Sequence, residues 1–160
     1  MRQFAKTVVA AALLVIPANS ATGGGAATPE VAVLEAATRW AIPPQVSPAP
    51  GSLVYLSVGN REDPPDALLG RLQDIANLRK VSQCPTVNVG DTPYPKPEPG
   101  NLVILLHSLT WHGRHRASVW VVRYHGPLSA SGCREYFSFT RGHWRHTDPG
   151  PNEGLECGVA

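Results

Sequence analysis

The amino-acid sequence predicts an α+β fold, with two N-terminal helices packed on a curved antiparallel sheet of four to five strands. Apolar residues recur at helical spacing in segments 28–41 and 63–76, and each segment begins with a helix-start signal. Between residues 101 and 147 the chain changes to apolar or alternating runs separated by turn residues, which is typical of strands. Segment 28–147 is therefore expected to form one domain.

The first 20 residues have the layout of a secretory signal peptide. Arg2 and Lys6 form a positive start, residues 7–16 are apolar, and small residues precede a cleavage site ahead of Ala21. The apolar run is shorter than the roughly 20 residues that a bilayer requires. We therefore expect a secreted or periplasmic protein that keeps no transmembrane anchor after processing, with residues 21–27 as a flexible leader.

The first helix is predicted from Thr28, which suits an N-cap, and from Pro29, which suits the first helical position. A proline-rich stretch at 43–50 must end it, because proline cannot continue a helix. Segment 53–58 follows as a β-rich run, and Asp63 and Pro64 repeat the helix-start signal. The sequence thus orders a helix, a strand and a second helix before the main sheet.

The alternating prolines Pro93, Pro95, Pro97 and Pro99 make segment 85–100 an expected polyproline-like loop. Segment 102–111 is nearly all apolar and suits a central strand with both faces covered. Segment 117–124 alternates with period two, which directs Ala117, Val119 and Val121 toward the helices. Turns then lead into strands at 134–140 and 143–147, and residues 148–160 form an expected C-terminal tail.

A spaced pattern in the sheet half resembles uncharacterised exported bacterial domains of the cystatin-like or NTF2-like α+β type. The resemblance covers about residues 53–146 and rests on Trp111, Ala117, Val119, Gly126, Leu128, Ser129, Gly132 and Trp144. It implies a conical fold that hosts isomerases, dehydratases and binding proteins. Such a fold does not by itself indicate a function, and the resemblance assigns no catalytic residue.

Charge is distributed unevenly along the chain, which has 14 basic and 12 acidic residues. Cleavage would remove Arg2 and Lys6 but no acid, leaving 12 of each and no net charge. Segment 101–147 holds six arginines and all six histidines, with Glu135 as its one acid. This half favours an anionic ligand or an envelope protein as partner, whereas export and zero net charge argue against nucleic acid.

The predicted binding residues lie on the strand face that does not pack on the helices. They combine cationic and aromatic side chains: Arg116, Trp120, Tyr124, Arg134 and Tyr136. The preferred interpretation is therefore an exported binding domain without catalytic activity and without a cofactor. One alternative is a small isomerase-like or hydrolase-like enzyme, in which His107 serves as a base inside a cone-shaped pocket.

A second alternative is a metal-binding protein that uses two His-x-x-His pairs, His112 with His115 and His143 with His146. Strand geometry argues against it, because residues three apart in a strand point to opposite faces.

The three cysteines, Cys84, Cys133 and Cys157, allow one disulfide and one thiol in an exported protein. A bond between Cys133 and Cys157 would close a loop of about 24 residues and stabilise the fold by about 3 kcal/mol. A bond between Cys84 and Cys157 would instead attach the tail to the loop after the second helix. The sequence leaves both pairings open.

Overall fold

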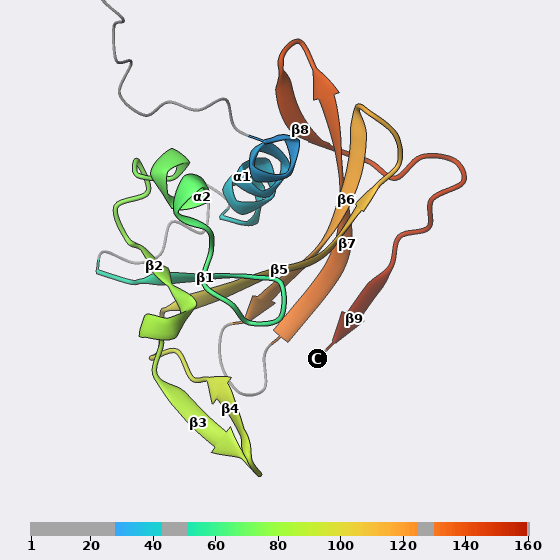
Figure 1. The fold of residues 1–160 in the computed structure, drawn as a ribbon. Helices are drawn as coiled ribbons and strands as arrows, with labels where there is room; N and C mark the ends of the chain where they lie inside the picture. Colours follow the sequence, from blue (N-terminus) through green and yellow to red (C-terminus); the bar gives the residue numbers. More distant parts are fainter. Residues whose placement is uncertain (1–27, 43–50, 125–129, 160) are drawn as a thin grey trace, which may run out of the picture.

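The structure is a computed structural model that describes residues 28–42, 51–124 and 130–159 (Figure 1). The expected signal peptide, the leader and the proline-rich stretch at 43–50 lie outside the described residues. Within the described ranges, no helix is both long enough and apolar enough to cross a membrane.

The described chain contains two α-helices, one 3-10 helix and nine strands. The helices are α1 (Pro29–Ala41), α2 (Asp66–Arg71) and the 3-10 turn η2 (Val81–Gln83). The strands are β1 (Val54–Val58), β2 (Leu78–Lys80), β3 (Thr86–Val89), β4 (Thr92–Pro95), β5 (Leu102–Trp111), β6 (Arg116–Tyr124), β7 (Ala130–Thr140), β8 (His143–Thr147) and β9 (Cys157–Val159).

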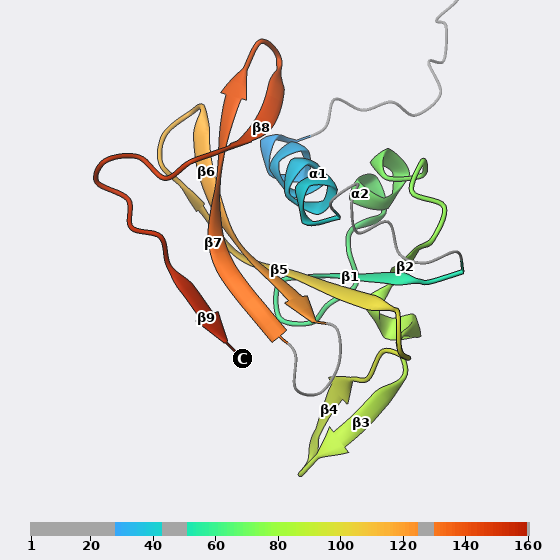
Figure 2. The same cartoon turned by 180° about the vertical axis from the view of Figure 1, so that it is seen from behind.

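Seven strands form one mixed sheet in the order β2-β1-β5-β6-β7-β8, with β9 also paired to β7. This sheet curls into a half-barrel around α1, so the predicted α+β class with a curved sheet is confirmed (Figures 1 and 2). The predicted four to five antiparallel strands were wrong, because β1 pairs in parallel with both β2 and β5. Parallel strands are joined by a crossover connection, so the two strands of a pair can lie far apart in the sequence. Local periodicity indicates that a segment is a strand, but it does not indicate which strand it pairs with.

The main core lies between α1 and the concave inner face of the sheet. Val33, Leu34 and Ala37 of α1 are buried in the same cluster as the inner-face residues of β5, β6 and β7. These residues are Leu102, Ile104, Leu106, Ala117, Val119, Val121 and Phe137. Burying each large apolar side chain stabilises the fold by about 1.5–3 kcal/mol. The packing of α1 inside the curve therefore stabilises the curved sheet.

The second helix is much shorter than expected. Only α2, with six residues, is helical in segment 63–76, so the expectation of two packed helices is not confirmed. Leu68 and Leu72 are still fully buried, which explains the apolar periodicity in the sequence. Arg39 of α1 donates to the Arg71 carbonyl at 2.8 Å and thereby caps the carbonyl end of α2.

The expected polyproline-like loop at 85–100 is instead largely a β-hairpin formed by β3 and β4. The two strands are joined by Gly90 and Asp91, and Gly90 takes a φ of 62°, which glycine adopts without strain. Pro93 and Pro95 lie opposite Asn88 and Thr86. The two proline-containing pairs are non-hydrogen-bonded pairs, which alternate with the hydrogen-bonded pairs of the hairpin. The pairing of β3 with β4 therefore needs no N–H group from either proline.

A β-bulge interrupts β5 where it pairs with β6. The register shifts between His107 and Thr110, and Ser108 takes a φ of 54° at the shift. The extra residue exchanges the two faces of the strand. His107 therefore pairs with Trp120 on the outer face, whereas Trp111 lies on the inner side, 5.7 Å from the Trp144 ring.

Candidate functional site

The five predicted binding residues share one face of the sheet. We call the face turned away from α1 the outer face. Strand register places Arg116 opposite Ser138, Trp120 opposite Arg134 and Tyr124 opposite Ala130. Tyr136 lies opposite Ser118 in the same ladder. Directly opposed residues of antiparallel strands project from the same side, so these five residues form an outer-face cluster.

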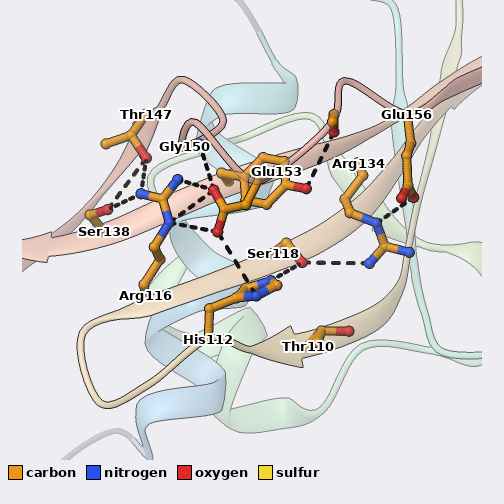
Figure 3. Close-up of polar contacts among 12 residues, drawn as sticks. Thr110, His112, Arg116, Ser118, Arg134, Ser138, Thr147, Gly150, Glu153 and Glu156 are labelled. Carbon is orange, nitrogen blue, oxygen red and sulfur yellow. Dashed lines mark hydrogen bonds and ion pairs between the residues drawn. The ribbon is translucent and has the colours of Figure 1, made fainter.

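The C-terminal segment 148–156 lies against this cluster (Figure 3). Glu153 accepts from Arg116 Nε at 3.0 and 3.1 Å, and a second nitrogen of the same guanidinium also contacts it. Glu156 accepts from Arg134 Nε at 2.7 Å, and its carbonyl accepts from the Arg134 backbone at 2.8 Å. The expected tail is therefore an ordered strap over the arginines.

Arg116 is the most extensively bonded side chain of the site. Besides Glu153, it donates to Ser138 Oγ at 3.0 Å and to the Asp148 carbonyl at 3.1 Å. Its hydrogen bonds lower the pKa of Glu153 from 4.5 to about 2, with smaller help from the Gly150 backbone. The same contact raises the pKa of Arg116. Both groups are thus charged at neutral pH.

A disulfide between Cys133 in β7 and Cys157 in β9 fixes the end of the strap. This pairing is one of the two left open by the sequence. Cys84 remains a buried thiol, and burial raises its pKa, which makes it a weak nucleophile at neutral pH.

The strap contacts three of the five residues of the outer-face cluster, namely Arg116, Arg134 and Tyr136, and leaves these three little open to an external partner. Tyr136 is only 4 % exposed, and its hydroxyl donates to the Gly154 carbonyl at 3.4 Å. Trp120 lies over Gly132, and Arg134 lies 5.8 Å from the Trp120 ring. Two of the cationic groups that the sequence assigned to a partner are thus paired within the chain.

The other arginines of segment 101–147 divide into two groups. Arg123 is on the inner face, where it donates to the Ala41 carbonyl and lies 4.2 Å from the Trp40 ring. Burial lowers its pKa. Arg114, Arg141 and Arg145 are exposed, and none forms an ion pair with a described residue.

These three arginines gather at one end of the sheet, where the β5–β6 loop meets the β7–β8 turn. Phe139 donates to the His115 carbonyl at 2.8 Å, and the two rings stack at 5.8 Å. This contact joins the two turns. We call the exposed group the hairpin end, and it consists of Arg114, His115, Arg141, His143 and Arg145. Sequence reasoning counted these arginines but did not single them out, since nothing local distinguishes them from paired ones.

His107, the candidate base, lies on the outer face and not inside the curve of the sheet. Its Nδ1 is 3.0 Å from Ser108 Oγ, and its ring is 6.1 Å from that of Trp120. Burial lowers its pKa, and the positive charge of Arg134 lowers it further. No carboxylate among the described residues hydrogen-bonds to this imidazole, so the arrangement lacks the third group of a catalytic triad.

Three of the four histidines of the two His-x-x-His pairs have separate partners. His112 contacts Ser118 at 2.8 Å and lies 3.9 Å from Glu153, while His115 stacks on Phe139. His146 contacts Glu135 at 2.9 Å on the inner face and stacks on Trp40. In the described part of the chain, no three His, Cys, Asp or Glu side chains are placed to hold a metal ion.

Comparison of the chain with protein-family models, curated proteins and solved structures finds no match. The resemblance to cystatin-like and NTF2-like domains therefore stays a prediction.

Proposed function

We propose that the protein is an exported binding domain without catalytic activity that recognises an anionic partner, such as an acidic segment of an envelope protein. The partner would contact the hairpin end. The observation that carries this proposal is the contrast between two sets of arginines. Arg116 and Arg134 are neutralised by carboxylates of the strap, whereas Arg114, Arg141 and Arg145 are exposed without such pairing among the described residues.

Exposed aromatic side chains beside these arginines support the proposal. Trp111 is 43 % exposed and Phe139 is 40 % exposed, and both border the hairpin end. Large aromatic residues and arginine are enriched in the residues that dominate binding energy. Clustered positive charge also attracts an anionic partner over a distance, in a salt-dependent way.

The strap provides an intramolecular example of the same chemistry. Glu153 and Glu156 are held by guanidinium groups that lie beside the Tyr136 and Trp120 rings on the outer face. An extended acidic segment therefore suits this surface. Direct contact of a partner with the outer-face cluster would require displacement of the strap, and it stays a prediction.

Elution from immobilised polyglutamate in a salt gradient tests the proposal. The triple variant R114Q/R141Q/R145Q should elute at clearly lower salt than the wild type, because charge attraction is lost and salt screens what remains. R79Q is the matched control, since Arg79 is also exposed but lies on β2, away from the hairpin end.

Equal elution of the triple variant and the wild type would contradict the proposal. A shift as large for R79Q would show that only net charge matters. The double variant R116Q/R134Q distinguishes the hairpin end from the outer-face cluster as the binding surface. Loss of binding in this variant would assign the partner to the outer-face cluster.

A further inference from the structure

A second feature of the outer face is a cavity of about 300 Å³ between the β3–β4 hairpin and the sheet. The hairpin projects from the body beside this face (Figures 1 and 2). The lining residues are Arg61, Val87, Val89, Tyr94, Pro95, Val103, Leu105, Val122, Tyr124 and Ala130. Small-molecule sites span about 300–1,000 Å³ and are mostly apolar, so the cavity fits a small ligand.

The wall of this cavity is mostly apolar, and Arg61 is its one charged side chain among the described residues. Val103 and Leu105 of β5 and Val122 of β6 form the floor, and exposed valines of β3 form the opposite side. Nothing in the Proposed function uses these side chains. Exposed valines are costly in water, and an apolar ligand would cover them.

Arg61 supplies the single positive charge. Its guanidinium lies 4.1 Å from the centre of the Tyr94 ring, and Nη1 donates to the Pro93 carbonyl at 3.4 Å. These contacts orient the guanidinium at the cavity. Within the described residues it forms no ion pair with a carboxylate. The backbone of Arg61 has a φ of 64°, which costs energy for a residue other than glycine.

We propose that this cavity binds a small amphiphilic carboxylate, namely a medium-chain fatty acid. The alkyl chain lies among the valines and Leu105, and the carboxylate pairs with Arg61. A planar guanidinium forms two parallel hydrogen bonds with a carboxylate, which selects a fatty acid over an uncharged alkyl ligand of the same length.

Calorimetric titration of the full mature chain with octanoate, octanol and acetate tests this assignment. Octanoate should bind about tenfold more tightly than octanol, because a charge-assisted hydrogen bond contributes about that factor. Acetate should not bind measurably, since it lacks the alkyl chain. R61Q should weaken octanoate to the level of octanol and leave octanol unchanged.

A second pair of variants tests the cavity itself. V89E places a carboxylate in the wall and should weaken octanoate, whereas L155E makes the same kind of change at an exposed leucine outside the cavity and should not. Thermal unfolding checks that both variants fold. Absence of octanoate binding, equal affinity for octanoate and octanol, or unchanged affinity in R61Q would each overturn the proposal. R79Q serves as the charge control.

Discussion

At the scale of single residues, the contact between Glu153 and Arg116 has the greatest consequence for how the surface is charged. The two residues are 37 positions apart, and the glutamate side chain is only 17 % exposed. The hydrogen bonds from Arg116 favour the ionised carboxylate, which is why its pKa falls to about 2. The strap is thereby held by a pair that remains charged over a wide pH range.

E153Q should lower the free energy of unfolding near neutral pH by about 1 kcal/mol, allowing for screening near the surface. Glu153 has a depressed pKa in the folded protein, so its stabilisation is fully present above 4.5 and is lost as the pH falls toward about 2. The difference between variant and wild type should therefore shrink over that interval. Urea unfolding across the pH range measures it.

E98Q is a suitable control, because Glu98 is exposed and pairs with no cation among the described residues. A pH-independent difference between E153Q and the wild type would contradict the ion pair as its cause.

Sequence alone could not separate the six arginines of segment 101–147. Their spacing correctly places Arg116 and Arg134 on one face, because strand periodicity decides it. Their carboxylate partners lie 37 and 22 residues downstream, in a segment without periodicity. Which arginine is neutralised therefore depends on the path of the strap, which no local pattern encodes.

At the scale of elements, β7 depends on a close approach of two side chains to its backbone. A Cβ atom at Gly132 would lie 2.9 Å from both Trp120 Nε1 and Val122 Cγ2. G132A should therefore lower the free energy of unfolding by about 1–3 kcal/mol through overpacking. Gly158, its partner in β9, would bring a Cβ no nearer than 3.9 Å to Trp120, so G158A should be close to neutral. Urea unfolding of the two variants gives the comparison, and equal stability would show that the approach is relaxed at no cost.

Long periodic elements were predictable, and short or irregular ones were not. The helix α1 and the strands from β5 to β8 follow their sequence patterns, because each buries one face against the same core. The β3–β4 hairpin was missed because its prolines favoured an extended loop. The Gly90–Asp91 pair between β-rich runs is a hairpin signal that could have revealed it. Strands of three residues, such as β2 and β9, carry too few positions for any period.

At the scale of the whole molecule, the disulfide links β9, the last described strand, to β7 of the main sheet. Replacing both cysteines in C133A/C157A removes a constraint on a loop of 24 residues. The chain-entropy argument gives a loss of about 3 kcal/mol for a loop of this size. The strap should then be released more readily, which limited proteolysis of the tail would detect.

C84A is the matched control, since it removes a cysteine and keeps the disulfide. Non-reducing peptide mapping should find one link in C84A and none in the double variant. A link that disappears in C84A would contradict the pairing.

The β3–β4 hairpin also affects whether copies of the protein polymerise. Pro93 and Pro95 remove the donors from the outer edge of β4, whereas Thr86 and Asn88 leave the outer edge of β3 able to pair. A fibril grows only if every unit has two strand edges that can pair, one with the preceding unit and one with the next. This hairpin has one such edge, that of β3. Two copies joined through β3 would present proline-blocked edges on both sides, so strand-to-strand growth from this exposed segment stops at a pair.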